Sequence, residues 1–438
     1  MHTTVIPLEI ISSIIDILAK DGQLEVLKDL SPVCSFFRDQ CRKHLFATIA
    51  IEEDGDLEVG ESQNLPSILQ FTTLISEHPG VAAHIRCLIL INPADGGDDQ
   101  AGLPEALSKL TNLSTLEIRL KSEFWSDILS ECIQALSQHA SFQHLILDDV
   151  AQFPINVIMA IPRLQHLELI AVELIEEEPL NPDSESIYLK SLAMTAFEDL
   201  EDGEPGTALE LMKPNGDFYI DLSKLESFRF LAASQDSANH VSRFFQSHRI
   251  ASLKEMSFSI SRFLDDEERR YNYTQALQSW ILPQQKTLRV LEFHSFALDL
   301  RDDPYLGLCQ TLDLLEAENA LTSLRVAITV SAFNRSEDVD IFGEQWRSLC
   351  NVLNKPGWKS LTEVSLRILG IGCSPRAQFA KLSSYFEPLT NSSKHFHFKL
   401  MLDHTPKEDI DEGDRRMSRL ISEFVAVAPS IAILPSLI

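Results

Sequence analysis

Two histidines near the C-terminal end come closest in their spacing to a metal-binding pattern. His395 and His397 alternate as strand residues do and could point to one side, as two metal ligands would. No third Cys, His or carboxylate follows at a defined spacing, so a solvent-facing strand edge explains the pair better. The acidic run at residues 265–268, followed by Arg269 and Arg270, is typical of a helix start with local ion pairs rather than of catalytic acids.

The motifs of the common enzyme classes are missing from the sequence. It contains no G-x-x-x-x-G-K-[ST], G-x-G-x-x-G, G-x-S-x-G or H-E-x-x-H, and its 16 glycines are dispersed. We therefore expect no catalytic residues, no metal, no cofactor and no enzymatic activity. An enzyme with an unrecognised site is the third alternative, which a deep pocket lined by carboxylates or histidines would favour.

The charge balance bears on the kind of partner. The 438 residues include 65 acidic and 37 basic side chains, for a net charge of −28. Binding to nucleic acid or to an anionic membrane requires an excess of Lys and Arg, so we expect neither partner.

The cysteines and the N-terminus bear on the compartment. The seven cysteines are scattered without a C-x-x-C pair, which is typical of reduced thiols. The first residues have no basic segment followed by a signal-peptide core, and the longest uncharged stretch, residues 424–438, is short for a membrane span. We expect a soluble cytoplasmic and/or nuclear protein.

One short pattern returns ten times after residue 80: apolar, two residues, apolar, one residue, apolar. Its period runs from about 22 to about 40 residues, a range that covers leucine-rich repeats and extends past them. The last two apolar positions of each unit have strand spacing. The units are Ile85/Leu88/Leu90, Leu113/Leu116/Ile118, Phe142/Leu145/Leu147, Leu164/Leu167/Leu169, Leu189/Leu192/Met194, Leu225/Phe228/Phe230, Leu253/Met256/Phe258, Leu288/Leu291/Phe293, Leu321/Leu324/Val326 and Leu361/Val364/Leu366.

Segments with helical period lie between many of these units. They include residues 124–136, 273–280, 308–315 and 342–353. Ordering one unit costs about 1–2 kcal/mol per residue in backbone entropy, and its three signature residues return only about 1.5–3 kcal/mol each. The units must therefore stack, which predicts a βα solenoid with an inner parallel sheet.

The first forty-six residues predict three short helices with a surplus of apolar surface. Leu8, Ile11, Ile15 and Leu18 form one stripe at helical spacing, and Ile10, Ile14 and Ile17 form a second. One stripe can pack within the module, whereas the other needs a different surface. Ser31 followed by Pro32 predicts the start of the third helix.

This segment resembles an F-box. The matching elements are residues 6–10 (IPLEI), the ladder Ile14/Ile15/Leu18, Leu27 and Leu30, residues 33–38 (VCSFFR) and residues 42–46 (RKHLF). The usual opening Leu-Pro is Ile-Pro here, and Phe37 stands where the family usually has tryptophan.

The resemblance implies the substrate-recognition subunit of an SCF-type cullin–RING ubiquitin ligase. In that family the F-box helices dock on a small Skp adaptor through apolar contacts. Carried over by position, the adaptor-binding residues are Pro7, Leu8, Ile11, Ile15, Leu30, Val33, Cys34 and Phe37.

The remainder resembles the irregular leucine-rich-repeat regions found behind F-boxes. We thus expect an α/β protein: an F-box-like helical module at 1–48, a linker and N-terminal cap at 49–80, and a leucine-rich-repeat-like solenoid at 81–438. A protein target should contact the residues that alternate with the buried triplets. They include Glu117, Arg119, His144, Asp148, Glu168, Arg229, Glu292, His294, Arg325 and Arg367. The alternative is a repeat scaffold that binds a protein partner without a role in ubiquitin transfer.

Overall fold

The computed structural model describes residues 7–52, 65–93, 102–176, 180–196, 209–232, 235–248, 250–260, 273–297, 303–315, 318–331, 343–371, 376–390 and 396–405. Along the chain these residues divide into two compact units, with the boundary between Ile187 and Tyr188. His395 and the acidic run at 265–268, with Arg269 and Arg270, lie outside the described residues.

Three helices occupy the N-terminal segment, as the sequence predicts. They are α1 (Leu8–Lys20), α2 (Leu24–Leu30) and α3 (Ser35–Leu45). Pro7 is the N-cap of α1, where its missing N–H costs no helical hydrogen bond. The predicted start of the third helix is wrong. Ser31 ends α2 by donating its N–H to the Leu27 carbonyl, and α3 begins four residues later with Cys34 as its N-cap.

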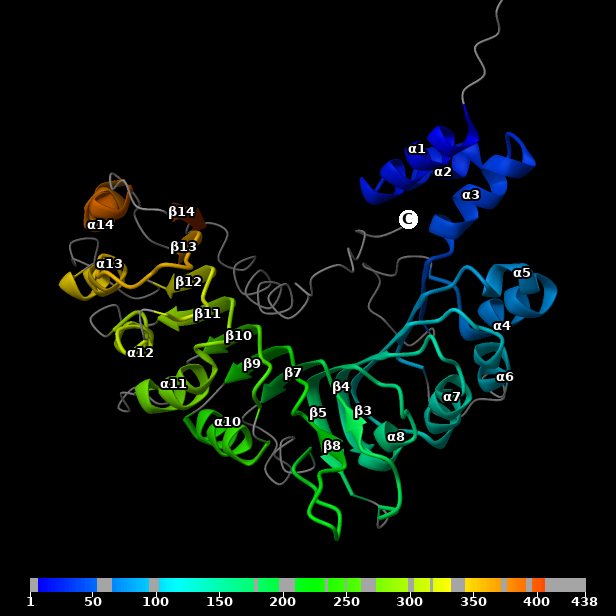
Figure 1. The fold of residues 1–438 in the computed structure, drawn as a ribbon. Coiled ribbons are helices and arrows are strands. Elements are labelled where there is room, and N and C mark those ends of the chain that lie inside the picture. The colour runs from blue at the N-terminus through cyan, green and yellow to red at the C-terminus, as the bar shows by residue number, and fades with distance from the viewer. Residues whose placement is uncertain are drawn as a thin grey trace, which may run out of the picture. The chain divides into compact units, whose positions relative to one another are not determined.

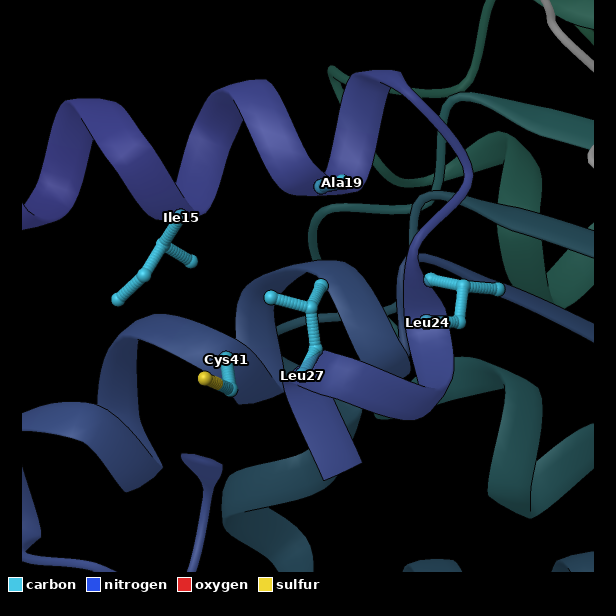
Figure 2. Packing of buried hydrophobic residues seen from close by; sticks show 5 residues of the cluster. All are labelled: Ile15, Ala19, Leu24, Leu27 and Cys41. Atoms are coloured by element: carbon cyan, nitrogen blue, oxygen red, sulfur yellow. The ribbon is translucent and has the colours of Figure 1, made fainter. Parts of the chain in front are cut away.

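The three helices share a small hydrophobic core of their own. Ile15, Ala19, Leu24, Leu27 and Cys41 are buried at its centre (Figure 2). Ile11, Leu18, Leu30, Phe37 and Leu45 pack around this centre and are partly buried. We call residues 7–46 the three-helix module.

The first unit continues with five parallel strands, each paired with the next in the chain. They are β1 (Thr48–Glu52), β2 (Cys87–Ile91), β3 (Thr115–Phe124), β4 (His144–Pro154) and β5 (His166–Ile175). Helices lie along one face of these strands (Figure 1). They are α4 (Ile68–Glu77), α5 (Pro79–Ala82), α6 (Leu103–Ser108), α7 (Asp127–Ser137) and α8 (Ile155–Met159).

The second unit repeats this arrangement with seven parallel strands. They are β7 (Ser191–Ala196), β9 (Ser227–Ala232), β10 (Glu255–Ile260), β11 (Val290–Ala297), β12 (Ser323–Ser331), β13 (Glu363–Ile371) and β14 (His397–Thr405). Its helices also line one face (Figure 1): α10 (Gln235–His248), α11 (Thr274–Ile281), α12 (Leu308–Leu312), α13 (Arg347–Leu353) and α14 (Arg376–Thr390), with 3-10 turns η2 (Leu282–Gln284) and η3 (Glu344–Trp346). The short strands β6 (Ile187–Tyr188) and β8 (Ile220–Asp221) lie outside the main sheet.

The protein is therefore a mixed α/β protein with 12 strands in its main parallel sheet. The last two residues of each of the ten sequence triplets lie on one of these strands, the first lies two residues before it, and the apolar side chains are buried. In β3, for example, Leu116 and Ile118 are fully buried. Strands β1 and β14 belong to the same parallel sheet, although neither corresponds to a triplet. The interval 49–80, expected to be linker and cap, contains most of β1 together with α4 and the start of α5.

Side chains alternate between the two faces of each strand. One set packs under the helices. The other set points to the opposite side, which we call the far face. The parallel register aligns far-face residues of neighbouring strands into rows that run across the strands.

Candidate interaction surfaces

The three-helix module exposes large aliphatic side chains although it has its own core. The exposed fractions are 55% for Leu8, 51% for Ile10, 49% for Ile14, 57% for Ile17 and 64% for Val33. Ile10, Ile14 and Ile17 are the second stripe expected from the sequence. The first stripe packs inward through Ile11, Ile15 and Leu18, while Leu8, at its start, stays exposed.

The predicted adaptor-binding residues divide into three groups by burial. Pro7, Leu8, Val33 and Cys34 are exposed. Ile11, Leu30 and Phe37 are half-buried against the module's core. Ile15 is only 1% exposed, so in this conformation its side chain stabilises the module and is not presented to a partner.

Burial also makes the thiols of Cys34 and Cys41 differ in reactivity. Cys34 is an exposed free thiol, whereas Cys41 is buried and burial raises the pKa of its thiol. Because a reagent can reach the exposed Cys34 thiol and not the buried Cys41 thiol, Cys34 is the more reactive of the two.

Five of the predicted target-binding residues come together on the far face of β3, β4 and β5. Arg119 donates through Nε to Glu117 Oε1 at 2.6 Å, and its Nε lies 3.8 Å from Asp148 Oδ2. His144 Nε2 lies 3.2 Å from Glu168 Oε1. Glu117 and Glu168 are only 6% and 8% exposed, so these two carboxylates are largely withdrawn from water, whereas the Arg119 side chain is 39% exposed.

Asp148 has the most perturbed carboxyl group of this cluster. Burial raises the pKa of Asp148 to about 6, the positive charge of Arg119 partly opposes that shift, and Glu117 and Asp149 add to it. The far face of the first unit therefore holds an acidic group that titrates between the usual ranges of carboxylates and histidines.

The other five predicted residues lie on the far face of the second unit. Arg325 donates through Nη1 to Glu292 Oε1 at 2.6 Å across β11 and β12. Arg229 is half-buried on β9, and Arg367 is exposed on β13.

His294 joins three strands of this face. Its Nδ1 lies 3.4 Å from Ser259 Oγ on β10, and its Nε2 lies 3.1 Å from Thr329 Oγ1 on β12. Burial, with a smaller contribution from Arg367, lowers the pKa of His294 to about 4. A neutral imidazole both donates and accepts a hydrogen bond, which suits two hydroxyl partners.

Sequence reasoning missed three residues of these surfaces. The ring centroid of His166 lies 5.4 Å from that of His144 on the neighbouring strand. Lys399 is exposed on β14, and the register places it in the row of Arg325. The Ser257 Oγ, next to Glu292 in register, is buried without a hydrogen-bond partner. His166 is the first residue of its strand, as His144 is, which is a signal that alignment of the repeats could have found.

The part of the chain that the structure describes lacks two further features. Within it, no group of three or more His, Cys, Asp or Glu side chains is placed to hold a metal ion. Nor is any described helix both long and apolar enough to cross a membrane.

Comparison with known proteins gives no family. No protein-family model and no curated protein matches this sequence.

Proposed function

We propose that the protein is a non-catalytic substrate-recognition subunit of an SCF-type ubiquitin ligase. In this proposal the three-helix module docks on a Skp-type adaptor, and the far face of the strands binds a protein target. The observation that carries it is the exposed aliphatic surface of a module that already buries a core of its own.

Free energy favours a partner on this surface. Fully burying a large aliphatic side chain contributes about 1.5–3 kcal/mol, so covering one that is half exposed returns about half of that. Five such side chains lie within the first 33 residues, which is unusually dense for surface exposed to water. Leu8 and Val33 also stand at positions where the F-box resemblance places adaptor contacts.

The mechanism is positioning rather than bond chemistry. A receptor that holds both adaptor and target raises the effective concentration of a target lysine near the ubiquitin-carrying enzyme. The far face supplies side chains of both signs, which suits a polar protein segment.

Co-purification tests the docking step. We expect a Skp-type adaptor to be recovered with the wild-type chain and to be lost with Leu8→Asp/Val33→Asp. A second variant, Ile14→Asp/Ile17→Asp, asks whether the other exposed stripe contributes. These side chains are 49–64% exposed, so the substitutions leave the buried centre of the module intact.

Leu69→Asp is the matched control, since Leu69 is 54% exposed on α4, outside the module. Adaptor recovery should survive this change. Equal recovery with wild type and with both module variants would contradict the proposal. No recovery with wild type would favour the scaffold without a role in ubiquitin transfer.

A further inference from the structure

On the far face of β9 to β14, two neighbouring rows carry more positive than negative charge, opposite to the balance of the chain as a whole. The register aligns one row across these strands: Arg229, Ser257, Glu292, Arg325, Ser365 and Lys399. The adjacent row adds Arg367 on β13. The two rows thus hold four cations against one carboxylate, in a sequence with 65 acidic and 37 basic residues. Glu255 and Glu363 lie in the row before them, towards the amino ends of the strands.

These cations are accessible. Arg325, Arg367 and Lys399 are exposed, and Arg229 is half-buried. Glu292 holds the Arg325 guanidinium through one of its nitrogens, Nη1, at 2.6 Å, which orients the group. The small residues Ser257 and Ser365 lie between charged positions of the first row, and Ala327 lies next to Arg367 in the adjacent row, so a bound chain could approach the sheet backbone there.

A buried hydroxyl independently indicates a ligand in the same row. Ser257 is 8% exposed, and its Oγ has no hydrogen-bond partner. A buried polar atom that forms no hydrogen bond costs free energy, and an oxyanion placed beside it would accept a hydrogen bond from the Ser257 hydroxyl. The register puts Ser257 between Arg229 and Glu292.

We propose that this face binds an acidic, extended polypeptide segment whose carboxylate or phosphoryl oxygens are held by Arg229, Arg325, Arg367 and Lys399. The inference rests on the proposed function, because it names the chemistry of the target. Neighbouring strands are about 4.8 Å apart, so five strand steps from β9 to β14 span about 24 Å, the length of an extended segment of about seven residues.

Fluorescence anisotropy with the full-length protein tests this inference. Three labelled peptides of about eight residues are compared: one rich in glutamate, one with phosphoserine in place of each glutamate, and one with glutamine there. We expect both anionic peptides to bind, the glutamine peptide not to bind, and affinity to fall as salt rises. Whichever anionic peptide binds more tightly identifies the source of the oxyanion.

Arg325→Glu/Arg367→Glu should weaken binding by about tenfold or more, because each reversal replaces an attraction by a repulsion. The matched control is Lys286→Glu/Lys359→Glu, which makes the same charge change at exposed positions of the same unit outside the strands. It should alter affinity by no more than about twofold. Lys399→Gln is a milder second variant and should weaken binding in the same direction.

Three results would overturn the inference: no binding of either anionic peptide, equal losses with the far-face and control variants, or equally tight binding of single-stranded DNA. Adaptor recovery is measured on the same preparations. Normal recovery without peptide binding rejects this inference alone, whereas loss of recovery concerns the proposed function.

Discussion

Asp148 shows how a single side chain reports its environment. The folded state raises its pKa from 3.8 to about 6, mainly through burial. Between these values the folded protein holds more protons than the unfolded chain, so rising pH lowers the free energy of unfolding. Above about pH 6 the full cost of the buried negative charge is present.

Asp148→Asn should therefore remove a cost that exists only at higher pH. We expect the difference in stability between variant and wild type to favour the variant by about 1 kcal/mol more at neutral pH than at pH 4, a figure reduced because the side chain is one-third exposed. Thermal unfolding at the two pH values measures it. Glu226→Gln is the control, and its stability difference from wild type should change with pH in the opposite direction, because a hydrogen bond from Lys254 lowers the pKa of Glu226. Identical differences at both pH values for Asp148→Asn would refute the assignment.

Residue-level prediction succeeded where spacing alone decides burial. Alternation along the strands placed Glu117, Arg119 and Glu292 opposite the helix layer, because a strand has a period of two. Helical spacing was less informative in the module. Leu8 and Ile15 belong to one stripe, yet Leu8 lies in the first turn beyond the reach of α2 and α3 and stays exposed, while Ile15 is buried between them.

Among the elements, α2 supplies two of the five buried residues at the centre of the module's core, Leu24 and Leu27. Leu27 is fully buried in the shared core, whereas its neighbour Val26 is 39% exposed. Leu27→Ala should destabilise the module by about 2–4 kcal/mol through lost burial and a cavity, and Val26→Ala should have little effect. Hydrogen exchange should then show loss of protection in α1 to α3 and unchanged protection in β3 to β5. A uniform loss throughout the first unit would show that the module does not unfold separately.

Ten strands were predictable because each carries the last two apolar residues of the same triplet. The two others have weaker signatures. In β14 the apolar residues Phe398, Leu400 and Leu402 alternate without the triplet, and β1 is a short strand directly after a helix. The start of α3 was misplaced because Ser31 and Pro32 are as compatible with a turn as with a helix start.

At the scale of the molecule, strand β1 determines how many N-terminal residues can be removed without exposing the edge of the sheet. It pairs with β2 along its whole length, and the Ala47 carbonyl accepts the N–H groups of Arg86 and Cys87. Removal of residues 1–45 should leave a monodisperse protein that binds acidic peptide but no adaptor. Removal of residues 1–52 should expose the apolar edge of β2 and cause aggregation. Size-exclusion chromatography with light scattering distinguishes the two, and equal solubility would contradict this role of β1.

The repeat pattern does not predict which partner the far face binds. The triplets specify the side that packs on the helices, whereas the far-face charges depend on register, which pairs residues from strands about thirty positions apart. Lys399 was overlooked for that reason, since only the register of β14 aligns it with Arg325.

The junction between module and sheet is short. Helix α3 ends at Leu45 and β1 begins at Thr48, so two residues connect a helix to a hydrogen-bonded strand. Such a joint transmits orientation, whereas a long flexible tether would let its ends rotate independently. A protein that binds the module would thereby also fix the orientation of the neighbouring strands. Insertion of a few glycines between α3 and β1 should make that orientation variable, while the affinity of each surface for its own partner stays unchanged.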